Sequence, residues 1–245
     1  MISYKPMSDK PSVRSPWFWV PSLYFAQGIP YVAVMIVSVL MYKRLGVSNT
    51  DIALYTSWLN LPWVIKPFWS PFVDLLKTKR WWVATMQLLI GAGLAGVAFT
   101  IPTTFFFQAS LAVFWLLAFS SATHDIAADG FYMLALDSHE QAFFVGIRST
   151  FYRIAIIAGQ GVLVMFAGFL ENSTGNIPLA WSVTFFILGG LFLALFLYHR
   201  YILPLPKGDK PSATVTPSTI LKEFFATFAS FFKKKHSVLS RTHSI

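Results

Sequence analysis

Six apolar runs, each about as long as a membrane-spanning helix, constrain this chain more than any other feature of its sequence. A helix needs roughly 20 mostly apolar residues to cross a bilayer, and short polar or charged segments separate one run from the next. The runs cover residues 17–42, 52–76, 82–101, 105–136, 143–170 and 180–203. The sequence therefore predicts an all-α membrane protein with six transmembrane helices.

Two of these runs carry features that disturb a simple crossing. The second run contains Pro62, Pro67 and Pro71, and each proline removes a backbone donor and is expected to kink the helix. The fourth run is too long for one crossing, so we expect its last residues, from about Asp129, to emerge into the membrane interface.

Composition excludes several other classes of protein. Hydrophobic residues make up 56% of the chain and charged residues 12%, whereas about a quarter of the residues in a soluble domain are charged. The sequence contains no cysteine, which excludes thiol catalysis and thiolate metal sites. No second histidine follows His124 at the spacing of an HExxH zinc site, and no glycine-rich phosphate-binding motif occurs. We therefore expect neither an enzyme nor a bound cofactor.

The formal net charge of +9 indicates how the chain is oriented in the membrane. If the N-terminus is cytoplasmic, fourteen lysine and arginine residues lie in cytoplasmic segments, and only Lys43 and Arg44 lie in an external loop. An excess of basic residues is typical of the cytoplasmic loops of multi-pass proteins. We therefore expect both termini in the cytoplasm, the lipid bilayer as a partner, and no nucleic-acid partner.

Polar side chains are concentrated on four of the six predicted helices. Tyr24, Gln27 and Tyr31 recur at helical spacing in the first helix, Asn60 lies in the second, and Gln160 lies in the fifth. A helix that lines an aqueous pathway carries such a polar stripe. The third and sixth runs are nearly apolar, and this three-plus-three recurrence is typical of transporters built from inverted repeats. The five residues are candidate cavity residues, although six helices can also fall into this order by chance.

Four ionisable side chains lie inside the predicted spans at a similar depth. An isolated charge at a helix centre costs about 2.5 to 3.5 kcal/mol, so charges inside the membrane require partners. Lys66 and Arg153 balance Asp125 and Asp129. His124 lies beside Asp125, and an unperturbed histidine titrates near neutrality. These residues are candidates for coupling or gating, with a proton as the coupled ion. The alternative is a structural role, in which buried ion pairs hold the helices in register.

Four segments of the chain resemble a known group of transporters. Residues 69–74 (WSPFVD), followed by a basic cluster, resemble the loop motif between the second and third helices of the major facilitator superfamily, and Asp74 matches the aspartate of that motif. The segments that resemble the AmpG-type muropeptide permease family are residues 25–30 (FAQGIP), 66–71 (KPFWSP) and 122–130 (ATHDIAADG). In two departures, proline and tryptophan replace the glycine-rich spacing of the loop motif, and His124 stands where those permeases have a glutamine.

This resemblance implies one half of a major facilitator superfamily transporter, made of two inverted three-helix repeats, in a bacterial inner membrane. It implies proton-coupled import, by symport, of muropeptides or a related polar small-molecule solute. A siderophore or an acyl-coenzyme A type solute is the alternative cargo. In that setting Tyr24, Gln27, Tyr31 and Asn60 would contact the solute, and Asp74 and the charged cluster would serve gating or coupling. A non-transporting membrane scaffold, or a gene fragment, is the competing interpretation.

Composition divides the chain into four segments. Residues 1–16 form a cytoplasmic tail, 17–203 the six-helix bundle, and 204–219 a linker rich in proline, serine and threonine. Residues 220–245 carry phenylalanines at helical spacing and a lysine cluster, which predicts an amphipathic helix on the cytoplasmic leaflet or packed against the transporter.

Superfamily members have two six-helix halves, and the sequence offers the spans of one. We expect either a truncated central loop, which is the favoured explanation, or a homodimer or second six-helix half around a shared cavity.

Overall fold

The computed structural model describes residues 14–210, and every regular element in this part of the chain is a helix. The first long helix is α1 (Val20–Val32), which continues through a π-helical turn (Ala33–Val37) into α2 (Ser38–Arg44). Another is α8 (Ser138–Ala158), which continues through a second π-helical turn (Gly159–Leu163) into α9 (Val164–Thr174). The other long helices are α6 (Lys79–Thr100), α7 (Phe106–Ala135) and α10 (Ile177–Ile202). Between α2 and α6 lie the short helices α3 (Asn49–Thr56), α4 (Leu61–Val64) and α5 (Ser70–Leu76). The expected tail helix in 220–245 lies outside the described residues, as does most of the 1–16 tail.

Within residues 14–210, five helical segments are long and apolar enough to cross a membrane: Pro16–Arg44, Lys79–Thr100, Phe106–Ala135, Ser138–Thr174 and Ile177–Ile202. They coincide with five of the six apolar runs, so the expectation of an all-α membrane protein is confirmed. α7 remains helical beyond Asp129 as far as Ala135. The emergence of its last residues into the interface stays a prediction.

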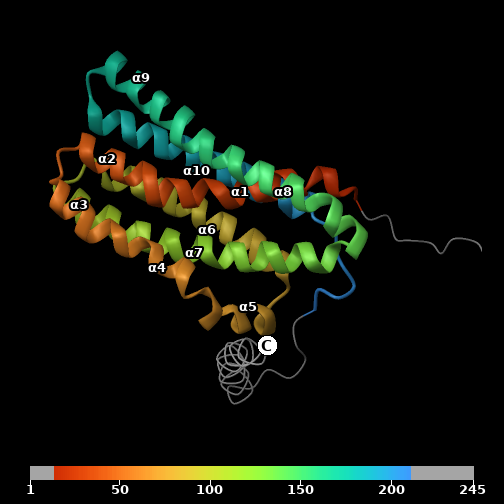
Figure 1. Ribbon diagram of the computed structural model, residues 1–245. Coiled ribbons are helices and arrows are strands. Elements are labelled where there is room, and N and C mark those ends of the chain that lie inside the picture. Colours follow the sequence, from red (N-terminus) through yellow and green to blue (C-terminus); the bar gives the residue numbers. More distant parts are fainter. Residues whose placement is uncertain (1–13, 211–245) are drawn as a thin grey trace, which may run out of the picture.

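The second apolar run is not one continuous helix but a series of short helices, and its crossing of the membrane stays a prediction. Pro62, Pro67 and Pro71 each lie in the first turn of a new short helix: α4, the 3-10 turn Lys66–Phe68 and α5. Proline is favoured in the first turn of a helix, because the backbone N–H groups there have no acceptor inside the helix. A proline also ends the helix that precedes it in the chain. As a result α5 lies apart from the line of α3 and α4 (Figure 1).

Local sequence signals mark where α6 and α8 begin. Thr78 caps α6 by accepting a hydrogen bond from the backbone N–H of Trp81 at 3.1 Å. Asp137 and Glu140 form a reciprocal capping box at the start of α8. These caps satisfy backbone donors that have no partner inside the helix, so α6 and α8 begin at defined residues.

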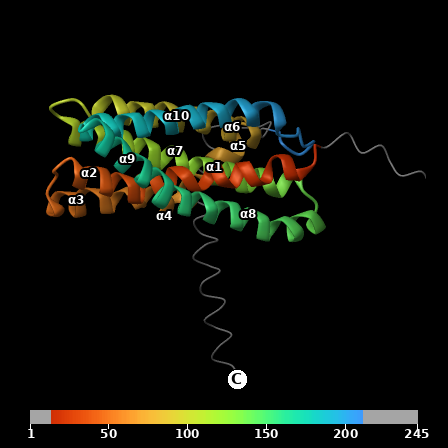
Figure 2. The same cartoon turned by 90° about the horizontal axis from the view of Figure 1, so that it is seen from above.

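The helices form a bundle in which α6 packs between α7 and α10, and α1 packs against α7 and α8. Figure 2 shows α6 and α10 on one side and α3, α4 and α8 on the other, with α1 and α7 between them. The core contains two apolar clusters, one around Tyr42, Phe114 and Phe185 and one around Trp19 and Phe131. The arrangement places α1 between α7 and α8.

Small residues set the distance between neighbouring helices, as in many membrane bundles. A Cβ atom on Gly189 of α10 would lie 3.0 Å from the carbonyl oxygen of Gly91 in α6. A Cβ atom on Gly28 of α1 would lie 2.7 Å from the Cβ atom of Ala155 and 2.9 Å from the carbonyl oxygen of Tyr152, both in α8. The α1–α8 contact therefore requires glycine at position 28.

Replacing Gly28 with alanine is expected to lower the free energy of unfolding by about 1 to 3 kcal/mol, because a methyl group forced into a filled interface displaces backbone. The matched control is Gly146→Ala in α8, where a Cβ atom meets nothing within 4 Å. That change should be neutral or stabilise by roughly 0.5 to 1 kcal/mol, since alanine is the better helix former. Thermal unfolding of both purified variants measures the difference. Equal behaviour would show that the α1–α8 contact is not tight.

The side of the bundle formed by α8 and α9 is largely uncovered. Met165 is 76% exposed, and Ile157 and Phe169 are also exposed. α1, in contrast, has most of its residues buried. An apolar surface of this kind faces either lipid or another protein surface.

Candidate functional site

A tyrosine, a carboxylate and a guanidinium meet where α1, α7 and α8 come together. The Tyr24 hydroxyl donates to Asp129 Oδ1 at 3.0 Å, and Arg148 Nη1 donates to the Tyr24 oxygen at 3.0 Å. Arg148 Nη1 also lies 3.4 Å from Asp129 Oδ1. The guanidinium lies over the rings of Tyr24 and Tyr132, 5.0 Å from each centroid, so cation–π contacts add to the hydrogen bonds. We call Tyr24, Asp129 and Arg148 the triad.

The partner of Asp129 is therefore Arg148, and the expected pair with Arg153 does not form. The two arginines are five residues apart on one helix, so they differ by about 140° in direction and about 7.5 Å in height. Counting residues in both directions from the turn at Asp137 identifies Arg148 as the partner of Asp129. Arg148 lies nearer that turn, as Asp129 does on the preceding helix, so these two share a depth.

The triad opens onto a groove of about 280 Å³ on the same three helices. Its lining residues are Tyr24, Gln27, Asp129, Arg148, Ser149, Tyr152 and Arg153. Arg153 is exposed there and has no hydrogen bond or ion pair within the described part of the chain. Gln27 is 9% exposed, and its Oε1 atom is buried without a partner among the described residues. The groove thus combines a free cation, a paired carboxylate and neutral hydrogen-bonding groups.

Lys66 forms an ion pair with Asp125, one of the two aspartates that its charge was expected to balance. Lys66 Nζ lies 2.7 Å from Asp125 Oδ2, and the two side chains are 28% and 8% exposed. Lys66 begins the 3-10 turn that follows the break after α4, so the interruption of the second apolar run lets this lysine reach α7. A buried carboxylate needs such a partner, because desolvation without one is costly.

His124 points away from the groove, although it is adjacent to Asp125 in the sequence. Its ring is fully buried, and its Nε2 atom lies 3.1 Å from the amide nitrogen of Gln87 in α6. The same amide lies within 3.0 Å of Nδ1 of His199 in α10, whose Nε2 lies 2.9 Å from Ser22 Oγ in α1. Consecutive residues on a helix point about 100° apart, which separates His124 from Asp125. A proton-handling role for His124 stays a prediction.

This network was not found from the sequence, because Gln87 and His199 are isolated polar residues in otherwise apolar runs. The third and sixth runs therefore contribute buried hydrogen bonds to the bundle rather than an apolar surface alone. The sequence does indicate that Gln87 and His199 need hydrogen-bond partners, because a buried amide or imidazole inside an apolar helix requires one.

The remaining candidate residues lie outside the groove. Tyr31 packs edge to face against Trp63, with ring centroids 5.1 Å apart. Asn60 ends the 3-10 turn before α4, and Gln160 is exposed in the π-helical turn after α8. Asp74 forms an ion pair with Lys79 at the start of α6. Their roles in substrate contact and gating stay predictions.

A fourth ion pair joins helices at the opposite end of the bundle. Arg44 of α2 pairs with Glu171 of α9, and Nε1 of Trp181 in α10 donates to Glu171 Oε1 at 2.7 Å. Glu171 is nearly buried, so this contact satisfies its charge and joins three helices.

Long apolar helices linked by ion pairs, with a polar groove between α1, α7 and α8, define an α-helical multi-pass membrane protein. The BT1 family matches residues 25–243, which is most of the chain. The chain therefore belongs to the BT1 family.

Two relatives show what the chain is similar to. A Rickettsia conorii protein named "Putative transporter AmpG 4" is 27% identical over 230 residues, covering 88% of this chain and 52% of that protein. The anhydromuropeptide permease of Escherichia coli K12 is 24% identical over 225 residues, covering 89% of this chain and 42% of the permease. The chain thus spans about half the length of the curated relatives it matches. The resemblance to AmpG-type permeases is confirmed, and these relatives carry the names of transporters, in agreement with the expectation that the chain is no enzyme.

Proposed function

We propose that this chain is the six-helix half of a secondary active transporter that imports muropeptides or a related polar solute by proton symport. The observation that carries the proposal is the groove between α1, α7 and α8, in which the free Arg153 lies beside the triad. Ionisable residues inside membrane spans usually mark substrate or ion pathways. The names of the relatives supply the class of solute.

The chemistry of the groove suits a solute that carries carboxylates and hydroxyl groups, as a peptide attached to a sugar does. A free guanidinium binds a carboxylate with two parallel hydrogen bonds. Gln27, Ser149 and Tyr152 line the same groove and offer neutral donors and acceptors. We assign Arg153 to the solute, and Asp125 and Asp129 to proton coupling.

In this proposal a second six-helix half, or a second copy of the chain, covers the groove. Two observations support it: the groove is open, and the apolar surface of α8 and α9 is exposed. Polar groups facing hydrocarbon without partners cost several kcal/mol each, so a covered groove is the more stable state. The excess of basic residues in one set of loops supports a cytoplasmic position for both termini. The bacterial relatives support a bacterial inner membrane.

Thiol labelling tests the proposal directly, because the chain contains no cysteine. Ser149→Cys in the groove should react with a charged, water-soluble thiol reagent, and added anhydromuropeptide should slow that reaction. The matched control is Ile187→Cys in α10, at an apolar side chain that is 51% exposed, which should stay unlabelled in the membrane. Cells that lack their own permease and express this chain should also take up labelled anhydromuropeptide.

Two results would contradict the proposal. If Ser149→Cys is as unreactive as Ile187→Cys, the groove contains no water, and a membrane scaffold explains the fold better. If labelling occurs but anhydromuropeptide gives no protection and no uptake, the solute assignment is wrong.

A further inference from the structure

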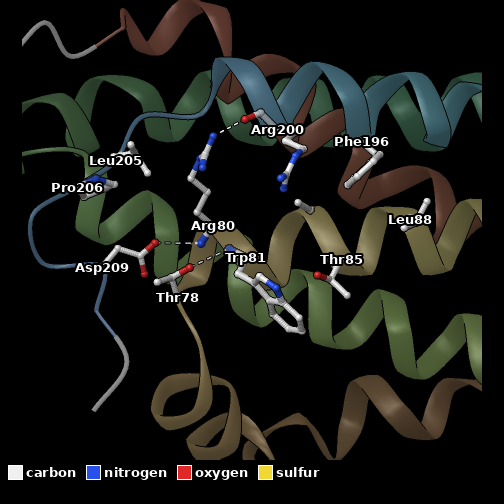
Figure 3. A pocket seen from close by; sticks show the side chains of 11 residues that line it. Thr78, Arg80, Trp81, Thr85, Leu88, Phe196, Arg200, Leu205, Pro206 and Asp209 are labelled. Carbon is white, nitrogen blue, oxygen red and sulfur yellow. Dashed lines mark hydrogen bonds between the residues drawn. The ribbon is translucent and has the colours of Figure 1, made fainter. Parts of the chain in front are cut away.

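A second hollow, which shares no lining residue with the groove, lies where α6 begins and α10 ends (Figure 3). Its volume is about 320 Å³. Arg80 and Trp81 line it from the first turn of α6, and Phe196 and Arg200 line it from the last turns of α10. The segment from Leu205 to Asp209 closes one side. We call this hollow the α6–α10 pocket.

Two guanidinium groups, those of Arg80 and Arg200, and one carboxylate, that of Asp209, line the α6–α10 pocket. Asp209 accepts hydrogen bonds from the backbone N–H groups of Lys79 and Arg80 at 2.6 and 3.0 Å, so each of its oxygens is engaged by the start of α6. Arg80 uses part of its guanidinium to donate to the carbonyl oxygens of Leu203 and Arg200. The Arg200 guanidinium has no hydrogen bond or ion pair within residues 14–210 and extends into the pocket in Figure 3.

The positive charge continues into an adjoining hollow. That hollow shares Arg80, Leu205 and Pro206 with the α6–α10 pocket and adds Arg14 and Lys207. Four cationic side chains therefore line two adjoining hollows, while Asp209 is the carboxylate among the residues that line them. An excess of guanidinium groups with free donors favours an anion that carries several oxygen acceptors.

The other walls of the pocket are apolar and exposed. Trp81 is 44% exposed and Leu205 79% exposed, and Leu88 and Phe196 continue the apolar surface along α6 and α10. Tryptophan and arginine at the ends of spanning helices lie at the depth of lipid headgroups. A small water-soluble anion needs no such apolar surface, whereas a lipid acyl chain does.

We propose that the α6–α10 pocket binds an anionic phospholipid, with its phosphate on Arg200 and Arg80 and an acyl chain along Leu88 and Phe196. Basic pockets between membrane helices bind anionic headgroups by charge attraction, and each nearby arginine or lysine strengthens that attraction. The lipid phosphate supplies negative charge to balance the basic side chains that Asp209 alone does not balance. This role is separate from solute transport in the groove.

The test is native mass spectrometry of the full chain, purified in detergent and incubated with equal amounts of phosphatidylglycerol and phosphatidylcholine. The wild-type chain should retain phosphatidylglycerol in preference. Arg200→Gln should weaken phosphatidylglycerol binding by about fivefold, the effect of one basic residue near an anionic headgroup. Arg200→Lys keeps the charge and should retain most of the binding. Lys210→Gln removes one charge from the same end but not from the pocket, and should bind as the wild type does.

A second variant keeps the test informative if Arg200→Gln folds poorly. Leu205→Glu changes an exposed side chain and adds a negative charge beside the phosphate position, so it should lower phosphatidylglycerol binding to a similar extent. Equal losses in Arg200→Gln and Lys210→Gln, or equal retention of both lipids by the wild type, would overturn the proposal. Displacement of phosphatidylglycerol by an equal concentration of inorganic phosphate would also overturn it, since the site would then be one for small anions.

Discussion

Replacing Lys66 with glutamine is expected to lower the free energy of unfolding by about 3 kcal/mol or more. The change removes the partner of Asp125, a carboxylate that is only 8% exposed. Breaking a buried ion pair from one side typically costs about 3 to 5 kcal/mol. The reverse change, Asp125→Asn, should cost less, because Lys66 is 28% exposed and can turn its ammonium toward water. Thermal unfolding in detergent gives both values.

The double variant Lys66→Gln with Asp125→Asn distinguishes a paired charge from ordinary packing. Removing both charges leaves no unpaired ion, so the double variant should be more stable than Lys66→Gln alone. Lys77→Gln is the control, since this exposed lysine also precedes α6 and its loss should change stability by less than about 0.5 kcal/mol. A double variant as unstable as the sum of the two single variants would show that the pair contributes nothing.

Replacing Asp129 with asparagine is expected to abolish uptake of labelled anhydromuropeptide driven by a pH gradient, while the chain still folds. The carboxylate is 48% exposed on the groove, so its pair with Arg148 contributes only about 1 kcal/mol or less to stability. A coupling carboxylate must exchange a proton during each transport cycle, which an amide cannot do. Full proton-driven uptake in Asp129→Asn and in Asp125→Asn would remove both carboxylates from the coupling role and leave them a structural one.

Measurements of folding and uptake in double variants also test whether Arg148, and not Arg153, is the partner of Asp129. Combining Asp129→Asn with Arg148→Gln should recover any folding lost in Asp129→Asn, whereas uptake stays abolished. Combining it with Arg153→Gln should recover no folding, because Arg153 does not contact Asp129. Binding of anhydromuropeptide should weaken in Arg153→Gln even with Asp129 intact, since the free guanidinium is the one assigned to the solute.

Several features could be predicted from the sequence because they depend on short stretches of chain. Apolar length predicts where helices cross the bilayer, and five of the six runs are such helices. Pro62, Pro67 and Pro71 indicate that the second run departs from one straight helix, although not that each would start a new one. Charge balance predicts that Lys66 pairs with Asp125 or Asp129, because a charge inside a bundle requires a partner.

The sequence by itself therefore determined the class of the protein and the residues that need partners, since both follow from local composition and from the cost of unpaired charge in hydrocarbon. Only the tertiary structure decided which partners meet. Arg148 replaces Arg153 beside Asp129, and His124 joins Gln87 and His199 instead of the groove. The physical reason is the rotation of each helix about its axis, which close contacts such as that of Gly28 with Ala155 set. Those contacts join residues far apart in the chain, so no local pattern reports them.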